Sequence, residues 1–250
     1  MTLDRNDDLS VLRMDNGKAN AMNPALLVEL DQGFAAFHEE DTSALVITGY
    51  DRFFSAGLDL VTLSELDREG MLGFMRLFKR VMRACFTIRR PVVAAVNGHA
   101  VAGGCVLAVQ ADWRVIADGK SKFGLNETRL GVGLPTCAAE SLRCQVPPAS
   151  FIRTTLEGEL FDPQQALALG LVHEVAPADD VLERASEKAR ALAQVPLPGF
   201  AQVKAVIRAH ALECIDSETK EQEQAWLDTW FHPATTELRQ EAVAQLTARA

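Results

Sequence analysis

Short apolar runs alternate with amphipathic segments along the chain. Apolar side chains return every three or four positions over residues 24–39 and 70–89, which predicts helices, the first beginning at Pro24. From Pro135 onward the pattern is mainly helical, with breaks at Pro147 and at residues 196–198. Alternating strands and helices predict an α/β fold. Four apolar runs bounded by turn residues predict buried strands: residues 9–14, 44–48, 91–96 and 113–117.

Two segments, residues 44–60 and 92–107, share one plan: an apolar strand, a glycine, a polar turn, small residues and the start of a helix. Small side chains let a ligand approach the backbone, and the first N–H groups of a helix lack an internal acceptor and carry partial positive charge. Two such turns that converge would polarise a carbonyl oxygen, as an oxyanion hole does. Taken alone, either turn more often reflects tight helix packing.

Composition narrows the function classes. The 250 residues are 48% hydrophobic, enough for one large domain or for one domain with a smaller appendage. The net charge of −9 argues against nucleic acid as a partner, because that binding rests on Lys and Arg contacts to phosphates. Five cysteines without a C-x-x-C pair predict free thiols in a reducing compartment, and five scattered histidines predict no metal site. No apolar run reaches membrane-spanning length, so we expect no membrane partner.

Several common catalytic motifs are absent from the sequence. There is no G-x-G-x-x-G after a strand and no G-x-x-x-x-G-K-[ST], which argues against dinucleotide and P-loop nucleotide binding. There is no G-x-S-x-G, which argues against a serine hydrolase of that type.

Glu127 is the candidate acid or base. It is a lone carboxylate in an apolar, glycine-rich stretch, residues 123–135, and burial would raise its pKa toward neutrality. The structural alternative is a helix cap or an ion pair with Arg129, and local sequence slightly favours that alternative. Glu140 is the next carboxylate to test if Glu127 is not the base.

Four segments together resemble the crotonase superfamily, also called the enoyl-CoA hydratase/isomerase family. They are residues 18–23, residues 54–60 (Phe-Ser-Ala-Gly-Leu-Asp-Leu), residues 95–105 and residues 123–135. The resemblance implies a crotonase-like α/β spiral of repeated ββα units with a C-terminal helical region. It also implies an acyl-CoA thioester as substrate, with no cofactor beyond the coenzyme A that the substrate carries.

Motif matching carries site residues over to this chain. The oxyanion donors fall on Leu58 and Gly103, and the catalytic carboxylate falls on Glu127. The resemblance implies further substrate or coenzyme A contacts from Lys18, Ala19, Asn20, Ala21, Ala56, Gly57, Asp59, Leu60, Ala102, Val106 and Asn126.

The residue at position 106 helps to choose between the reactions that the family catalyses. Enoyl-CoA hydratases similar to this chain carry a second glutamate three residues after the oxyanion glycine, and here that position is Val106. One carboxylate is sufficient to move a proton between C2 and C4, so the expected reaction is Δ3-to-Δ2-trans-enoyl-CoA isomerisation in fatty-acid β-oxidation. Alternatives with the same fold are a hydratase, a thioester hydrolase and a decarboxylase. A CoA-binding or RNA-binding relative that has lost catalysis is a further alternative, disfavoured by the acidic charge and the retained Glu127.

The resemblance also implies the larger organisation. We expect a core over residues 1–190 and a C-terminal region over residues 191–250 that takes part in trimerisation and covers the active site. A homotrimer or hexamer is expected. The polar, acidic start of the chain predicts no secretory signal, so a cytoplasmic location is expected. Candidates for the coenzyme A phosphates are Arg13, Lys18 and the basic face between Arg76 and Arg83.

Overall fold

The strands form two sheets. The computed structural model describes residues 1–248, and the side chains of all of these except Lys18 and residues 246–248. All neighbouring strands of the larger sheet are parallel except the hairpin between its first two. Its order is β1 (Thr2–Asn6), β2 (Leu9–Arg13), β3 (Ala44–Thr48), β5 (Val92–Val96), β7 (Trp113–Ala117) and β10 (Glu174–Ala176). The smaller sheet has the order β4 (Phe53–Ser55), β6 (His99–Val101), β8 (Phe123–Gly124) and β9 (Leu160–Phe161).

The chain repeats one path through these sheets. It adds a strand to the larger sheet, then a strand to the smaller sheet, and then forms one or more helices. The repeats end in α2 (Leu60–Leu63) with α3 (Arg68–Thr87), in α4 (Gly103–Gln110), and in η2 (Thr128–Leu130) with α5 (Thr136–Gln145). The expected spiral of ββα units is therefore confirmed.

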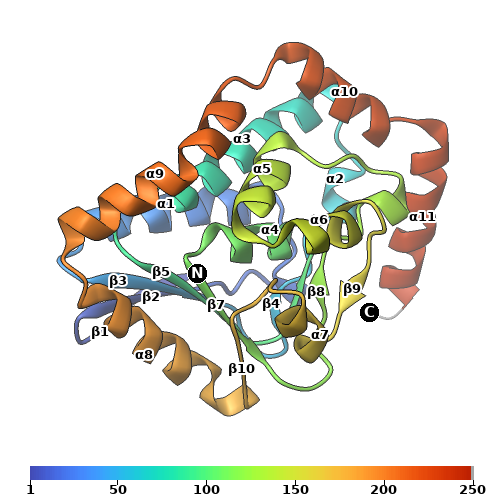
Figure 1. Cartoon of the computed structure of the whole chain (residues 1–250). Helices are drawn as coiled ribbons and strands as arrows, with labels where there is room; N and C mark the ends of the chain where they lie inside the picture. The colour runs from blue at the N-terminus through green and yellow to red at the C-terminus, as the bar shows by residue number, and fades with distance from the viewer. Residues whose placement is uncertain (249–250) are drawn as a thin grey trace.

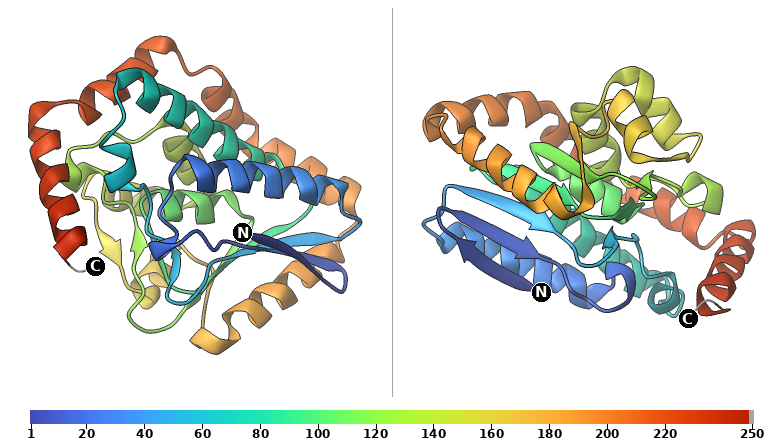
Figure 2. Two further views of the ribbon diagram at one scale, coloured as in Figure 1. Left: turned by 180° about the vertical axis from the view of Figure 1, so that it is seen from behind. Right: turned by 90° about the horizontal axis from the view of Figure 1, so that it is seen from below.

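Helices cover both faces of the larger sheet (Figures 1 and 2). Alternate strand residues such as Val46, Val93 and Val115 pack against α8 (Val181–Ala193) on one face. Their neighbours, such as Ile47, face the main core formed with α3 and α1 (Pro24–Glu39). This alternation follows from the two-residue period of a strand.

The first long helices begin where side chains cap them. At α1 the Asn23 side chain accepts the N–H of Leu26, and Pro24 occupies the first turn, where its missing N–H costs nothing. At α3 the Asp67 side chain accepts the N–H of Gly70. The predicted helix over residues 70–89 is therefore real but begins at Arg68 and ends at Thr87.

The rest of the chain is mainly helical, as expected. In Figure 1 the last three helices form an arc over one side of the molecule. The division expected at residue 190 falls inside α8 and stays a prediction, and residues 249–250 of the C-terminal region lie outside the described part. None of the described helices combines the length and apolarity needed to cross a membrane. The remaining helices are η1 (Lys18–Asn20), α6 (Pro148–Thr155), α7 (Pro163–Ala168), η3 (Ala178–Asp180), α9 (Leu197–Asp216), α10 (Lys220–Trp230) and α11 (Pro233–Ala248).

Candidate active site

The two small-residue turns lie against each other. A methyl group added at Gly57 would come within 2.7 Å of the Val101 carbonyl oxygen and 3.1 Å of the Gly103 nitrogen. Gly57 also has a φ of +87°, a conformation that favours glycine. The convergence expected from the shared plan of the two segments is therefore present.

Leu58 and Gly103 supply two free backbone donors. Within the described part of the chain, neither N–H has a hydrogen-bond acceptor. Gly103 is the first residue of α4, where the N–H has no partner inside the helix. Ala102, which precedes it, has a φ of +51°. This conformation is strained for a residue other than glycine, and proteins retain such strain mainly at functional sites. Two such donors can hold a carbonyl oxygen that gains negative charge.

A buried asparagine holds the first turn against the loop of residues 18–23. The side chain of Asn20 donates to the carbonyl oxygens of Met14 and Phe54 and accepts the N–H of Asn16. Ser55 Oγ donates to the Asn20 carbonyl at 2.8 Å. These partners occupy the polar atoms of the Asn20 side chain, so that side chain orders the loop.

Leu58, Gly103, Val106 and Glu127 line one pocket. The pocket encloses about 290 Å³ of space, part of it open to solvent. Glu127 is the one titratable side chain among the described residues that line it. Six lining residues were not predicted as site residues: Met75, Phe78, Val132, Gly133, Pro135 and Trp226.

One oxygen of the Glu127 carboxyl is shielded from solvent and has no hydrogen-bond partner. The residue as a whole is half-buried, but Oε2 is shielded from solvent and has no hydrogen bond. Burial raises the pKa of Glu127 to about 7, and nearby backbone N–H groups of Glu127 and Asn126 oppose part of that rise. A carboxyl with a pKa near neutrality can both accept and return a proton.

The structural alternatives for Glu127 are wrong. Arg129 does not pair with it, because its Nε donates to the carbonyl oxygens of Glu157 and Gly158. Glu127 precedes the short helix η2, but its side chain makes no capping hydrogen bond. Glu140, the fallback candidate, pairs with Arg143 on its own helix at 3.4 Å and does not line the pocket.

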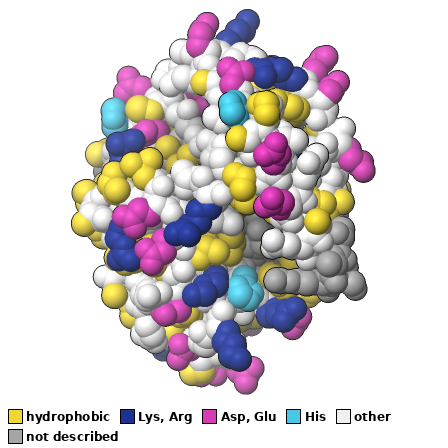
Figure 3. Space-filling view, turned by 90° about the vertical axis from the view of Figure 1, so that its right-hand side faces the viewer, with side chains coloured by type: hydrophobic (Ala, Val, Ile, Leu, Met, Phe, Trp, Pro, Cys, Tyr) yellow, Lys and Arg dark blue, Asp and Glu magenta, His cyan; other side chains and the backbone are white. Residues whose placement is uncertain are grey.

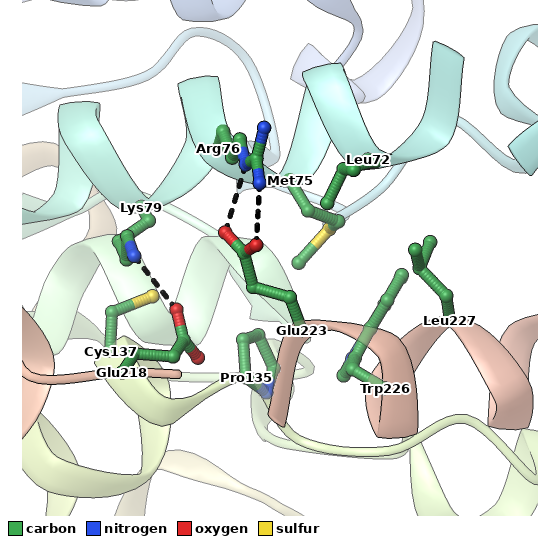
Figure 4. A pocket seen from close by; sticks show the side chains of 10 residues that line it. All are labelled: Leu72, Met75, Arg76, Lys79, Pro135, Cys137, Glu218, Glu223, Trp226 and Leu227. Atoms are coloured by element: carbon green, nitrogen blue, oxygen red, sulfur yellow. Dashed lines mark hydrogen bonds and ion pairs between the residues drawn. The ribbon is translucent and has the colours of Figure 1, made fainter. Parts of the chain in front are cut away.

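The cations on the basic face of α3 are paired with carboxylates. Arg76 is paired with Glu223 at 2.7 Å, and Lys79 with Glu218 at 2.9 Å (Figure 4). Arg80 pairs with Asp31, and Arg83 binds Asp216 through two nitrogens. The partners come from segments more than 100 residues away, except Asp31, so the sequence could not reveal them. The phosphate site on this face stays a prediction, and a phosphate there would compete with these carboxylates for the cations.

The Lys and Arg side chains on the face shown in Figure 3 do not gather into one basic surface. On the face shown in Figure 3, Lys and Arg side chains are scattered among Asp and Glu side chains, with apolar side chains exposed between them. Arg13 donates to the Gly49 carbonyl oxygen at 3.1 Å. The side chain of Lys18 lies outside the described part of the chain.

The other predicted contacts surround the pocket without lining it. Asp59 caps α2, because its carboxylate accepts from the N–H and the hydroxyl of Thr62. Ala19 accepts the N–H of Ala56 through its carbonyl, which joins the two loops. Ligand contacts from these positions stay predictions. The full set outside the lining is Ala19, Asn20, Ala21, Ala56, Gly57, Asp59, Leu60, Ala102 and Asn126.

Among the described residues, no three His, Cys, Asp or Glu side chains are grouped so that they could hold a metal ion. The described residues that line the pocket supply two backbone donors and one carboxyl among apolar side chains.

The spiral of ββα units, together with a pocket that combines two backbone donors and one carboxyl, fits the crotonase class of enzymes. The sequence profile of the enoyl-CoA hydratase/isomerase family matches residues 4–244, and the protein belongs to this family.

Three relatives illustrate the similarity. A probable enoyl-CoA hydratase of Rhizobium meliloti is 32% identical over 233 residues, 92% of this chain and 87% of that protein. An enoyl-CoA isomerase of Mycobacterium tuberculosis has an apo structure with a TM-score of 0.81 at 31% identity, covering 91% of this chain and 95% of that one. Human mitochondrial Δ3,Δ2-enoyl-CoA isomerase reaches a TM-score of 0.91 over 97% of this chain and 95% of its own, at 24% identity, which shows a shared fold alone.

The names of the relatives do not distinguish the reaction. Hydratase names are more frequent than isomerase names among them. The Mycobacterium tuberculosis protein has itself been called both an isomerase and a probable hydratase.

Proposed function

We propose that the protein isomerises 3-enoyl-CoA thioesters to 2-trans-enoyl-CoA thioesters by a single-carboxylate proton shuttle. The observation that carries the proposal is the pocket lining, in which Glu127 is the one titratable group among the described residues and Val106 is apolar. Val106, which is 4% exposed, stands at the position where the hydratases that this chain resembles carry a second glutamate.

The proposed steps use three groups of this chain. The Glu127 carboxylate removes a proton from C2, and the electrons of that C–H bond pass into the thioester carbonyl. The N–H groups of Leu58 and Gly103 hold the enolate oxygen while the charge resides there. The protonated Glu127 then gives the same proton to C4, and the double bond moves from C3–C4 to C2–C3. The shuttle is neutral overall and needs no metal or cofactor besides the coenzyme A of the substrate.

Water addition is harder to arrange with this lining. A hydratase needs one group to activate water and another to deliver a proton, and one carboxyl cannot hold both protonation states at once. The prevalence of hydratase names among the relatives nevertheless makes hydration the second candidate.

The test is a comparison of two substrates on one enzyme preparation. The purified protein is given a 3-enoyl-CoA and, separately, a 2-trans-enoyl-CoA of the same chain length. Isomerisation well above hydration is the expected result. Robust hydration of the 2-enoyl-CoA with no detectable isomerisation would reject the proposal in favour of a hydratase.

A neighbouring cavity is the candidate path for longer acyl groups. It encloses about 370 Å³, part of it open to solvent, and shares Met75, Pro135 and Trp226 with the Glu127 pocket (Figure 4). We expect longer acyl groups to extend past Met75 and Trp226 into this cavity. A 3-enoyl-CoA series of increasing chain length measures how far that extension improves kcat/KM.

The expected trimer or hexamer has a candidate surface on α9. Val203, Val206 and Ile207 are spaced so that they share one face of this helix, and they are 56%, 61% and 64% exposed. Exposed apolar stripes of this kind favour association. Mass measurement by light scattering tests it, since Val206→Glu should lower the oligomeric state.

A further inference from the structure

The loop that follows Glu127 is fastened by the two C-terminal helices. Thr229 Oγ1 on α10 accepts the N–H of Gly133 at 2.8 Å. Trp226 Nε1, also on α10, donates to the carbonyl oxygen of the same glycine at 2.7 Å. Thr235 Oγ1 on α11 donates to the Gly131 carbonyl at 3.0 Å. Both backbone polar groups of Gly133 are thus bound by side chains nearly 100 residues further along the chain.

Backbone hydrogen bonds within the same loop tie it to Glu127. The Glu127 carbonyl oxygen accepts the N–H groups of Leu130 and Val132, each at 2.9 Å. Val132 lies between the two fastened glycines and is buried in the pocket wall. A displacement of Gly131 or Gly133 would therefore be transmitted through Val132 to Glu127.

The contact between the Glu127 loop and the two C-terminal helices leaves little free space. A methyl group added at Gly131 would lie 2.7 Å from Thr235 Oγ1, and one added at Gly133 would lie 3.1 Å from Thr229 Oγ1. Thr229 Oγ1 also donates its proton to the Trp226 carbonyl at 2.7 Å. The hydroxyl thus has both an incoming and an outgoing hydrogen bond, which fixes its direction.

Ion pairs hold α10 against the helix that forms the opposite pocket wall. Arg76 on α3 binds Glu223 on α10, and Arg68 binds Asp228 and Gln224. The stretch of α3 between these arginines carries Met75, which lines the pocket together with Trp226. Helix α10 is therefore held at Glu223 and at Asp228, on either side of Trp226 and one residue before Thr229.

We propose that Thr229 and Trp226 are positioning residues, which hold Gly133 from both sides and so keep the Glu127 carboxyl in place at the pocket. The inference rests on the proposed function, in which Glu127 moves the proton. It assigns to α10 a part in catalysis that does not require contact with the reacting atoms.

The electrostatic setting of Glu127 makes the proposal measurable. Burial is the main cause of its raised pKa, and Cys105 on α4 is the titratable group that interacts with it electrostatically. Arg129, its nearest cation in sequence, is directed to backbone carbonyls instead. A loop that moves and admits water should therefore lower the pKa of Glu127 toward the ordinary value of 4.5.

The test uses Thr229→Val, which keeps the side-chain shape and removes the hydroxyl, and Thr229→Ser, which restores it. Thr87→Val is the matched control, because Thr87 Oγ1 donates only to carbonyls of its own helix. We expect Thr229→Val to lower kcat about tenfold to a hundredfold with little change in KM, since small misplacements of reacting groups cost about this much. Thr229→Ser should recover most of the loss, and Thr87→Val should match the wild type.

A second readout does not depend on turnover. Carbon-13 NMR of glutamate-labelled protein, assigned with Glu127→Gln, follows the titration of the Glu127 carboxyl. We expect its pKa to fall in Thr229→Val and to stay unchanged in Thr87→Val. An unchanged pKa and unchanged kcat in a folded Thr229→Val would overturn the positioning role. Failure of the wild type to isomerise any 3-enoyl-CoA would instead reject the proposed function, whatever the NMR titration gives.

Discussion

Glu127 and Val106 line the same pocket but come from different elements. Glu127 lies in the loop after β8, and Val106 lies on the buried helix α4. Val106 follows the free N–H of Gly103 by three residues, so it lies one helical turn behind a candidate oxyanion donor. An apolar side chain at this position leaves one carboxyl to carry out any proton transfer in the pocket.

Replacing that carboxyl should stop turnover. Glu127→Gln keeps the size of the side chain and removes the proton carrier, so we expect kcat to fall by about 10³-fold or more, while the Kd for a saturated acyl-CoA changes little. Glu140→Gln is the control, because Glu140 pairs with Arg143 outside the pocket. Steady-state kinetics and calorimetry measure both. Retained turnover in Glu127→Gln would exclude Glu127 as the base.

The buried carboxyl should also make stability depend on pH. Its pKa is raised to about 7 in the folded protein, against 4.5 for an ordinary glutamate. The stabilisation of the folded state by the protonated Glu127 carboxyl is therefore complete below pH 4.5, and it is lost as the pH rises through 7. The shift corresponds to at most about 3 kcal/mol. We expect Glu127→Gln to be more stable than the wild type at pH 8 and close to it at pH 5, as measured by urea unfolding. Equal differences at the two pH values would contradict a raised pKa.

A second carboxylate should change the reaction. Val106→Glu places a like charge in the pocket of Glu127, so we expect the kinetic pKa values of the pair to separate and the isomerase rate to fall. Hydration of a 2-enoyl-CoA should become detectable, because one carboxyl can then activate water while the other donates a proton. Val106→Gln is the uncharged control. Hydration in both variants, or in neither, would mean that a second carboxylate at this position does not decide between the reactions.

Crowding at the paired turns should make Gly57 sensitive to a single methyl group. In Gly57→Ala the methyl would meet the Val101 carbonyl and the Gly103 N–H in a backbone conformation that favours glycine. We expect a loss of about 1–3 kcal/mol in the free energy of unfolding from the strained backbone. We expect a fall of about 10²-fold in kcat from the disturbed donors. The exposed Gly73 of α3 has nothing within 4 Å of an added methyl, so Gly73→Ala should instead stabilise by about 0.5–1 kcal/mol. Similar stability and activity in the two variants would argue against the close contact.

A buried ion network should anchor α9 to the sheet. Asp112 binds Lys204 at 2.7 Å and Arg208 at 2.8 Å, and these two cations are 6% and 2% exposed. Asp112→Asn leaves both cations without their carboxylate, so we expect a loss of about 3–5 kcal/mol in the free energy of unfolding. Asp216→Asn breaks an exposed pair with Arg83 and should cost less than about 1 kcal/mol. Denaturant unfolding compares the two, and equal effects would show that the buried network adds no more stability than the exposed pair.

The two central turns could be predicted because their information is local. Small residues followed by a helix start produce free N–H groups wherever they occur, and the repeated plan of residues 44–60 and 92–107 indicated a pair of them. The short strands of the smaller sheet were missed for the opposite reason. Strands of two or three residues, such as β8, carry no detectable hydrophobic period, and they form only because the spiral brings them together.

By itself the sequence determined the alternation of strands and helices and the pair of small-residue turns. Its motifs also carried the resemblance to the crotonase superfamily, which implied the spiral, the candidate donors Leu58 and Gly103 and the candidate base Glu127. Each depends on residue types and spacings along the chain. Only the tertiary structure decided that the cations of α3 are paired, that the Asn20 side chain is a scaffold, and that Trp226 belongs to the pocket. The Asn20 side chain reaches across 34 residues to Phe54. The pairing of Arg76 and the place of Trp226 in the pocket depend on the packing of α10 on α3 and on the Glu127 loop, over separations of up to 147 residues. Burial acts in the same way, because it was the enclosure of one carboxyl by distant apolar side chains that raised the pKa of Glu127.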